Sequence, residues 1–335
     1  MGVRMLVVGA GGIGGYFGGR LLGAGRDVTF LVRAQRAAQL ARTGLIIRSP
    51  LGDLDLPAPP TVTAEALRAA DAVDAGREVR EPFDLILLAV KAYDLDAAMD
   101  DVAPAVGPRT LILPLLNGMR HLDRLDERFG ADRVLGGQCV VSTTLDPEGR
   151  ILHLDGSASL AFGARDRSRA EPLEAIAATL SVAGFEARLS AAIVQEMWEK
   201  WVSVATVAGM TCLMRAAIGD IVAAGAGDLT TALLDECAAI AAQQGHALSA
   251  AVLQDRRAAF TAPDSELTAS MLRDIERGAP IEAEQILGDL LRRAGRGAGT
   301  GVTSLLRVAY AHLMTYDARR ARAHAAGMGV GTTSE

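Results

Sequence analysis

The chain has 335 residues, of which 50% are apolar and 22% are charged, and this length and balance favour two globular domains rather than one. Its formal net charge of −6 gives no support for binding nucleic acid or an anionic membrane surface. Only 12 residues are Pro and the 36 Gly residues follow no triplet period, which excludes a mainly disordered or a collagen-like chain.

The first half of the sequence alternates strand-like and helix-like segments. Its strand-like apolar runs are continuous, which is typical of strands that helices cover on both faces of a parallel sheet. This alternation predicts βαβ units and an α/β fold with a doubly wound parallel sheet. The expected strands are 5–8, 27–32, 85–90 and 110–113, and the expected helices are 13–23 and the first part of 64–81, which continues as a surface loop.

The pattern changes in the second half. Residues 134–162 alternate apolar and polar side chains around an Asp-Pro-Glu-Gly turn, so we expect an antiparallel hairpin that closes the sheet. Beyond residue 190 the sequence shows only helical periods, which predicts an all-helical second domain. We therefore divide the chain into an α/β domain at 1–189, a helical domain at 190–326 and a disordered tail at 327–335.

A glycine motif directly follows the first predicted strand. The sequence GAGGIG at residues 9–14 matches GxGxxG between a strand and a helix, the context that a dinucleotide-binding turn requires. Gly9 allows the tight turn, Gly11 lets the backbone approach a pyrophosphate, and Gly14 permits close packing of the helix, whose free N-terminal amides attract the anion. The alternative is a glycine-rich turn that binds nothing. We predict a Rossmann domain that contacts its cofactor through Gly9, Gly11, Gly12, Ile13 and Gly14.

The choice of cofactor depends on the end of the second strand. In an NAD-binding site a carboxylate at this point binds the ribose 2′-hydroxyl. Residues 28–49 contain no Asp or Glu, and Arg33 stands at the strand end with Arg36 one turn later. Cations in these positions suit a 2′-phosphate. We therefore predict NADP(H) with Arg33 as a contact, while Arg36 is either a second phosphate contact or an exposed helix charge.

Lysine is rare in this chain, which contains 32 Arg but only two Lys, Lys91 and Lys200. Arg keeps its proton near neutral pH, whereas a Lys ammonium can act as a proton donor, so the two retained lysines suggest a chemical role. Chance survival under a codon bias is the alternative. Lys200 lies between Trp198 and Trp201 on the first helix of the second domain. Because a nicotinamide cofactor carries hydride, the protein must supply a proton donor, and we expect it to be Lys200 rather than a surface lysine.

Further polar residues follow strands or interrupt helices. Lys91 and Asn117 come after apolar strand-like runs, and the carboxyl ends of parallel strands form the ligand crevice of doubly wound sheets. Each could face cofactor or substrate, or be solvated at the rim. In the helical half, Ser270 and Glu282 lie on either side of a break at 278–280, and taken alone they are typical of an ordinary helix residue and an exposed charge.

The three cysteines lie far apart, with no CxxC pair and no Cys/His grouping at metal-ligand spacing, so we expect neither a metal site nor disulfides. A reducing cytoplasm fits this pattern. No apolar run reaches the roughly 18 residues of a membrane span, so we expect no membrane partner. The apolar helices leave the oligomeric state open, and a homodimer is one arrangement that they allow.

Taken in order, these motifs resemble the ketopantoate reductase (2-dehydropantoate 2-reductase) family over nearly the whole chain. The resemblance implies an N-terminal Rossmann domain and a helical C-terminal domain similar to that of 6-phosphogluconate dehydrogenase. It also implies that NADPH reduces ketopantoate, a 2-oxo acid, to (R)-pantoate on the pantothenate route. The matching residues are the glycine motif, Lys91, Asn117-Gly118-Met119, Trp198-Glu199-Lys200, and Ser270-Met271 followed by Glu282.

The resemblance also implies roles for individual residues. Lys200 matches the family's catalytic acid, and Glu282 matches its substrate-binding carboxylate. In that scheme Lys200 donates a proton as hydride reaches the carbonyl carbon, while Glu282 accepts hydrogen bonds from a substrate hydroxyl and helps to hold the ammonium. The remaining matches are Ser270 and Asn117 at substrate contacts, and Arg33, Lys91 and Asn117 near the cofactor, with Arg33 at its 2′-phosphate.

One departure from the family pattern concerns the substrate. One and two turns after the lysine, better-studied members carry asparagines that contact substrate, whereas this chain has Val204 and Ala208. Their absence removes hydrogen bonds to a polar ligand, so a family reductase for a different, less polar 2-oxo acid is an alternative. A non-catalytic NADP(H)-binding sensor is a further alternative, although it would be expected to lack the acid, and Lys200 and Glu282 are both present.

Overall fold

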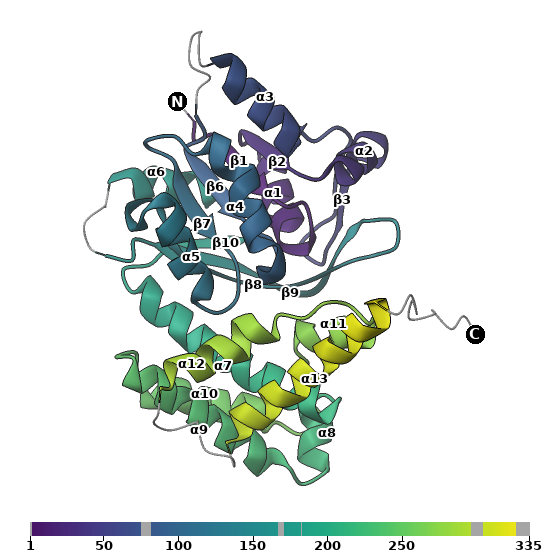
Figure 1. The fold of residues 1–335 in the computed structure, drawn as a ribbon, viewed down its shortest axis with the longest axis vertical. Helices are drawn as coiled ribbons and strands as arrows, with labels where there is room; N and C mark the ends of the chain where they lie inside the picture. Colours follow the sequence, from purple (N-terminus) through teal and green to yellow (C-terminus); the bar gives the residue numbers. More distant parts are fainter. Residues whose placement is uncertain (1, 75–81, 167–170, 182, 296–303, 326–335) are drawn as a thin grey trace. The chain divides into compact units, whose positions relative to one another are not determined.

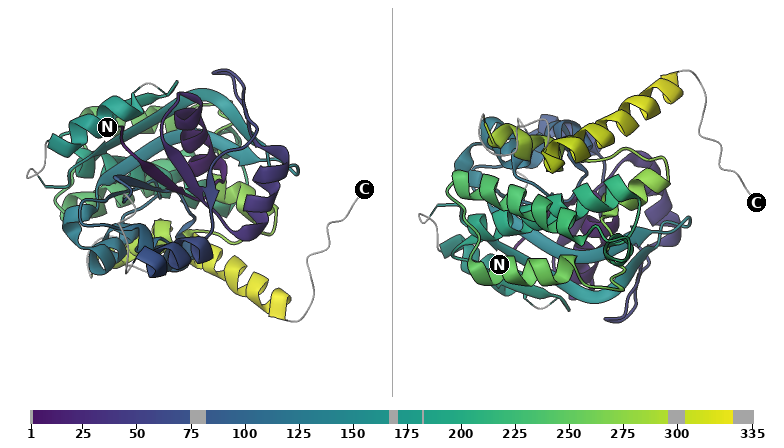
Figure 2. Two further views of the ribbon diagram at one scale, coloured as in Figure 1. Left: turned by 90° about the horizontal axis from the view of Figure 1, so that it is seen from above. Right: turned by 90° about the horizontal axis from the view of Figure 1, so that it is seen from below.

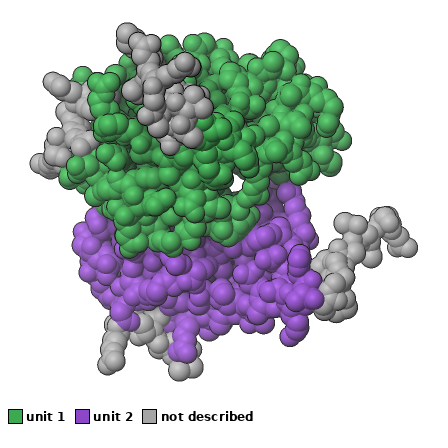
Figure 3. Space-filling model, turned by 45° about the horizontal axis from the view of Figure 1, so that its top comes forward, with its two compact units in different colours: residues 1–116, 121–194 green, residues 117–120, 195–335 purple. Residues whose placement is uncertain are grey.

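The computed structural model describes residues 2–74, 82–166, 171–181, 183–295 and 304–325 (Figure 1). The chain forms two compact units, which are coloured separately in Figure 3. Unit 1 contains residues 1–116 and 121–194, and unit 2 contains residues 117–120 and 195–335. The short segment 117–120 therefore belongs to the second unit, although it comes from the first half of the chain. The tail predicted at 327–335 lies outside the described residues.

Unit 1 is built from two β-sheets and the helices that pack against them. Its strands are β1 Met5–Val8, β2 Val28–Leu31, β3 Leu45–Arg48, β4 Leu54–Leu56, β5 Thr61–Val62, β6 Leu85–Leu88, β7 Leu111–Pro114, β8 Gly136–Leu145, β9 Ile151–Gly163 and β10 Glu186–Leu189. Its helices are α1 Gly12–Gly23, α2 Ala34–Thr43, α3 Ala64–Asp74, α4 Leu95–Val102, α5 Arg120–Phe129 and α6 Glu171–Leu180, with short 3-10 helices at Ala92–Asp94, Ala103–Ala105 and Ala131–Arg133. The first residue of α5 is the last residue of the segment that belongs to unit 2.

The first sheet has the strand order β5-β2-β1-β6-β7, and all of its pairs are parallel. Every residue of β1, β6 and β7 is buried, as expected for strands covered on both faces. The chain moves outward from β1 first to one side and then to the other, so the strand order reverses beside β1. In doubly wound sheets the ligand crevice lies outside the carboxyl ends of the strands at this point. The predicted α/β fold is confirmed.

The hairpin predicted at 134–162 forms, but it does not close the parallel sheet. β8 and β9 pair antiparallel, from Gly136 opposite Gly163 to Leu145 opposite Ile151. They belong to a second sheet, in which the long β9 also pairs with β3 and β10, and β3 pairs with β4. The prediction of a closing edge was wrong because β3, β4 and β10 have only three or four residues each and are partly exposed, so their apolar pattern is weak.

The helix α1 contacts strands of both sheets, and its glycines remove the side chains that would keep them apart. A Cβ atom on Gly18 would lie 2.6 Å from Phe30 of β2, and one on Gly19 would lie 2.7 Å from Leu45 of β3. The helix therefore approaches the two sheets more closely than a larger side chain would allow. This packing fixes the start of α1, and with it the glycine turn that joins β1 to α1.

All secondary-structure elements among the described residues of unit 2 are helices, which confirms that the second domain is helical. The helix α13 contacts α9 and the π-helical turn, and its C-terminal half extends past its neighbours (Figure 2). Within the described ranges, no helix is both long and apolar enough to cross a membrane. The helices are α7 Ile193–Met214, which begins in unit 1, α8 Ile218–Ala223, α9 Gly227–Gln243, α10 Ala250–Phe260, α11 Ser270–Glu276, the π-helical turn Glu284–Gly288, α12 Asp289–Arg293 and α13 Leu305–Ala325.

Candidate functional site

The glycine turn predicted to bind the cofactor stands at the carboxyl end of β1, beside the end of β6. Gly9 has a φ of +93°, a conformation that glycine adopts freely and that strains any residue with a side chain. A Cβ atom on Gly9 would lie 3.1 Å from the carbonyl oxygen of Ala89, which follows β6. A Cβ atom on Gly14 would lie 2.0 Å from the carbonyl oxygen of Gly9, so α1 packs on the turn only because residue 14 has no side chain. This is the close helix packing that a dinucleotide-binding turn requires.

The same turn fits a bound pyrophosphate. The first amides of a helix have no partner within the helix, and those of α1 follow the extended residue Gly11. A Cβ atom on Gly11 would meet nothing within 4 Å, so open space lies beside the backbone at this residue. By contrast, a Cβ atom on Gly12 would lie 2.8 Å from Oγ1 of Thr143 on β8. An anion beside Gly11 would be stabilised by these amides and by the positive end of the α1 dipole.

Charged side chains stand at the ends of the two strands that flank β1. Arg33 follows β2, its side chain is 79% exposed, and its Nη2 donates to Oδ1 of Asp94 at 2.7 Å. Asp94 ends the 3-10 turn after β6, and its amide donates to the carbonyl oxygen of Lys91 at 2.9 Å. Lys91 is half-buried. The structure thus places Arg33 and Lys91 at the carboxyl edge of the parallel sheet, and it adds Asp94, which the sequence analysis missed.

Arg36 is not the exposed helix charge that one interpretation of the sequence allowed. It is half-buried, and its Nη2 donates to the carbonyl oxygens of Ala10 at 3.0 Å and Gly149 at 3.1 Å. Its Nη1 donates to Oε1 of Gln39 at 2.7 Å, and burial lowers the pKa of the guanidinium. The side chain therefore holds the glycine turn against the turn between β8 and β9. Of the two arginines, Arg33 is the one that a ligand can reach more easily.

Lys200, the predicted proton donor, lies on α7 and is half-buried. Trp198 and Trp201 are 3% and 1% exposed, with ring centroids 4.8 Å apart. The indole nitrogen of Trp201 donates to the carbonyl oxygen of Ile286 at 2.8 Å. This bond joins the part of α7 that carries Lys200 to the π-helical turn that follows Glu282.

Glu282, predicted to bind substrate, comes from the segment between α11 and the π-helical turn. It is only 9% exposed, and the amide of Ile286 donates to its backbone carbonyl at 3.0 Å. Two residues later, Glu284 accepts a hydrogen bond from the hydroxyl of Tyr310 at 2.5 Å. Burial and this hydrogen bond raise the pKa of Tyr310 to about 12. The backbone around Glu282 is therefore held both by the π-helical turn and by α13.

Asn117 comes from the first half of the chain but packs on the same π-helical turn. The side-chain amide of Gln285, which is 5% exposed, donates to the carbonyl oxygen of Asn117 at 2.9 Å. Three residues further on, Nη1 of Arg120 donates to Oε1 of Glu284 at 3.4 Å. Within unit 2, the segments that carry the predicted acid, the predicted carboxylate and Asn117 are thus joined by hydrogen bonds.

Ser270 is on α11, which begins beside the later part of α7. It begins α11 and is exposed, and the amide of the preceding Ala269 donates to Oγ1 of Thr211 at 3.3 Å. Thr211 is on α7, eleven residues beyond Lys200, which corresponds to a rise of about 16 Å along the helix.

Cysteine and metal chemistry find no support in the described residues. The three cysteines are buried and free, and burial raises the pKa of Cys212 and Cys237 to about 12, so these thiols are poor nucleophiles at neutral pH. In the part of the chain that the structure describes, no group of three or more His, Cys, Asp or Glu residues could hold a metal ion.

Comparison with known proteins identifies the family. The sequence model of ketopantoate reductase PanE/ApbA matches residues 5–167, and the model of its C-terminal part matches residues 192–316. The chain belongs to the ketopantoate reductase family. YkpB, an uncharacterized oxidoreductase of Bacillus subtilis, is 34% identical over 319 residues, which cover 95% of this chain and 100% of that protein.

Solved structures agree with this family. The crystal structure of 2-dehydropantoate 2-reductase from Geobacter metallireducens has a TM-score of 0.81 at 26% identity, over 93% of this chain and 99% of that one. A D-mandelate dehydrogenase, determined with NADH and anilino(oxo)acetate, also has a TM-score of 0.81, over 95% of this chain and 100% of that one. At 20% identity the second likeness is one of fold alone. The ketopantoate reductase fold is thus known with a bound nicotinamide cofactor.

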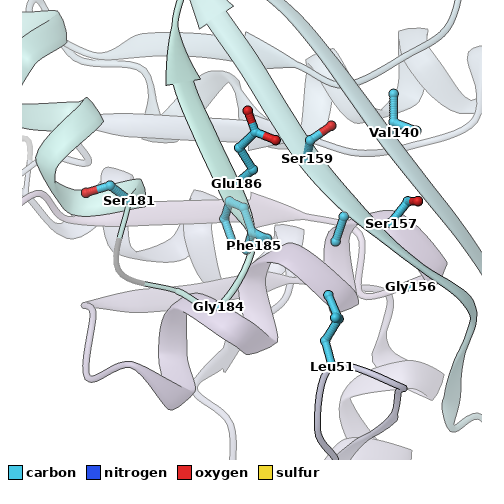
Figure 4. A pocket seen from close by; sticks show the side chains of 10 residues that line it. Leu51, Val140, Gly156, Ser157, Ser159, Ser181, Gly184, Phe185 and Glu186 are labelled. Atoms are coloured by element: carbon cyan, nitrogen blue, oxygen red, sulfur yellow. The ribbon is translucent and has the colours of Figure 1, made fainter.

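A pocket of about 670 Å³ lies on the second sheet of unit 1 (Figure 4). Ser159 on β9 and Glu186 on β10 line this pocket, and their side chains lie next to each other because the two residues are paired in the sheet. Leu51 and Phe185 add apolar surface to the lining. None of the residues predicted for the ketopantoate reductase site lines this pocket, and we assign it no part in the reaction.

The contact between Gly118 and the π-helical turn leads to a prediction about stability. Gly118 has a φ of +79°, and a Cβ atom on it would lie 2.8 Å from the carbonyl oxygen of Gln285. We expect Gly118→Ala to lower the free energy of unfolding by about 1–3 kcal/mol through backbone strain, with a further loss from this clash. Gly225→Ala is the control, because Gly225 has a φ of +81° and open space around it. Equal losses of stability in the two variants, measured by urea denaturation, would show that the contact with Gln285 is unimportant.

Proposed function

We propose that the protein reduces ketopantoate (2-dehydropantoate) to (R)-pantoate with NADPH. The observation that carries this proposal is the linkage within unit 2, where Trp201 and Gln285 join the segments of Lys200, Glu282 and Asn117 in a chain of the ketopantoate reductase family. Bound NADPH would supply the hydride. The chain's own residues then have to bind the 2-oxo acid and deliver one proton.

Lys200 is the proposed proton donor to the carbonyl oxygen of the substrate. Its ammonium would also stabilise the negative charge that develops on this oxygen. Glu282 is buried, and a carboxylate in that position can accept hydrogen bonds from a substrate hydroxyl and keep the ammonium in place. Glu282 is not the anchor of the substrate carboxylate, because two like charges repel each other. Asn117 and Ser270 are proposed as further substrate contacts.

NADP(H) is the proposed cofactor, bound by the glycine turn from Gly9 to Gly14. Two observations support the phosphorylated form: β2 ends without a carboxylate, and the accessible Arg33 stands two residues after it. A guanidinium can bind a phosphate through two parallel hydrogen bonds. Lys91 at the end of β6 and Asn117 are proposed as additional cofactor contacts.

A second candidate is reduction of a less polar 2-oxo acid by the same residues. The part of α7 between Lys200 and Thr211 carries the half-buried Val204 and the buried Ala208, at the two positions where the family resemblance implies asparagines. A substrate that lay against this part of α7 would meet apolar side chains. Loss of a hydrogen bond to a polar ligand group costs about 1–3 kcal/mol, which favours a ligand without that group.

The two candidates are separated by a substrate panel. Purified full-length protein is incubated with NADPH or NADH and with ketopantoate or one of several branched 2-oxo acids, and the loss of reduced nicotinamide absorbance is followed. The proposal predicts that ketopantoate gives the highest kcat/KM and that the product is (R)-pantoate. A branched 2-oxo acid that is preferred by orders of magnitude would favour the second candidate. No turnover of any 2-oxo acid would favour a non-catalytic NADP(H)-binding sensor.

A further inference from the structure

The ion pair between Arg33 and Asp94 reaches across the end of β1. Arg33 follows β2 and Asp94 follows β6, and these strands lie on opposite sides of β1 in the sheet. Strands separated by one intervening strand are roughly 10 Å apart, so the two side chains bridge this distance where the glycine turn begins. Both partners are accessible, with 79% and 37% of their side chains exposed. The pair therefore lies where the adenosine ribose of a dinucleotide reaches in a Rossmann domain.

The carboxylate of Asp94 affects the two nicotinamide cofactors in opposite ways. A ribose 2′-hydroxyl can donate a hydrogen bond to a carboxylate, which is the contact that NAD-binding domains use at the end of β2. A 2′-phosphate carries about two negative charges, so it is repelled by Asp94 and competes with it for Arg33. Arg36 offers the phosphate no equivalent partner, because its guanidinium is bonded to the carbonyl oxygens of Ala10 and Gly149.

We propose that Asp94 is a specificity-determining residue that weakens the preference for NADPH and lets the protein use NADH as well. This inference rests on the proposed function only in assuming a nicotinamide cofactor. Residues 28–49, which include β2 and the segment after it, contain no acidic residue, and the structure supplies one from the turn after β6. Asp94 thus replaces, from a distant part of the chain, the carboxylate that an NAD-preferring domain carries at the end of its second strand.

The test uses Asp94→Asn, which keeps the shape of the side chain and removes its charge. Asp94 precedes α4 but makes no side-chain capping hydrogen bond, so the helix loses no cap in this variant. Asp96→Asn is the matched control, because Asp96 lies two residues further on, in the first turn of α4, and forms a similar exposed ion pair with Arg124 at 2.9 Å. Binding of 2′,5′-ADP and of 5′-AMP to the full-length proteins is measured by titration calorimetry, which requires no catalysis.

Asp94→Asn is expected to bind 2′,5′-ADP about 5- to 10-fold more tightly than the unmodified protein does. This is the effect expected from removing the solvent-screened repulsion between one carboxylate and a phosphate in contact with it. The affinity of this variant for 5′-AMP should fall slightly, because the neutral amide accepts a weaker hydrogen bond from the ribose 2′-hydroxyl than a carboxylate does, and Asp96→Asn should match the unmodified protein with both probes. The gain should shrink in 1 M NaCl, where the Debye length is about 3 Å. In steady-state assays the ratio of kcat/KM for NADPH to that for NADH should rise by a similar factor.

Two outcomes would overturn the inference. Unchanged binding of 2′,5′-ADP in Asp94→Asn would show that Asp94 does not interact with the phosphate, and weaker binding would show that it positions Arg33 instead. Failure of the proposed function gives a different result. If no 2-oxo acid is reduced but Asp94→Asn still gains affinity for 2′,5′-ADP, the reductase assignment is lost and the role of Asp94 in cofactor discrimination is retained.

Discussion

Replacing Lys200 by Ala is expected to lower kcat for NADPH-dependent reduction of the 2-oxo acid by about 10²–10⁴-fold, the usual contribution of a general acid. The substitution removes the only proposed proton donor to the carbonyl oxygen. It leaves the glycine turn and Arg33 untouched, because these belong to unit 1. NADPH binding, measured by fluorescence titration, should therefore remain within about twofold of the unmodified protein, well under 1 kcal/mol.

Lys200→Arg distinguishes the positive charge of Lys200 from its ability to donate a proton. Arginine keeps a positive charge on α7 but does not release a proton near neutral pH, so we expect this variant to bind substrate better than Lys200→Ala and still to turn it over slowly. Unfolding curves of the two variants serve as the check on folding, since the buried Trp198 and Trp201 are unchanged in both. If Lys200→Ala kept a kcat comparable to that of the unmodified protein, another group would have to be the acid.

The strands β1, β2, β6 and β7 of the parallel sheet were predictable because they are almost entirely buried, whereas the half-buried, two-residue β5 was not expected. The strand expected at 5–8 forms at those residues, and the one expected at 110–113 forms one residue later. The second sheet was not predictable, since its short strands are half-exposed and depend on β9 for their pairing. Sequence alone therefore indicates the sheet that carries the glycine turn, but not the one that covers the other side of α1.

The candidate site was predictable where a residue belongs to a local motif, and not where its surroundings depend on packing. The motif GAGGIG at residues 9–14 predicts a dinucleotide-binding turn from residues that are adjacent in the sequence. The pairing of Arg33 with Asp94 depends instead on β2 and β6 lying on either side of β1, and the two residues are 61 positions apart. Gln285 gave no signal either, because its bond to Asn117 requires a segment of the first half to pack in the helical unit.

Gly11→Ala is expected to abolish most cofactor binding without affecting the fold. The backbone of Gly11 is extended with a negative φ, and a Cβ atom on it would meet nothing within 4 Å, so alanine fits the protein itself. The added methyl group would occupy the space in which we place the pyrophosphate. We expect the affinity for NADPH to fall about 10- to 100-fold, equivalent to the loss of one charge-assisted hydrogen bond.

Gly14→Ala and Gly156→Ala are the controls that distinguish a loss of cofactor binding from a loss of stability. A Cβ atom on Gly14 would lie 2.0 Å from the carbonyl oxygen of Gly9, so α1 would have to move, and overpacking of this kind costs about 1–3 kcal/mol of stability. Gly156 has open space around its Cβ position and stands on β9, so Gly156→Ala should alter neither property. Calorimetric binding and thermal unfolding of all three variants give the comparison. If Gly11→Ala retained full affinity for NADPH, the pyrophosphate could not lie beside Gly11. The dinucleotide would then have to bind elsewhere than beside this turn.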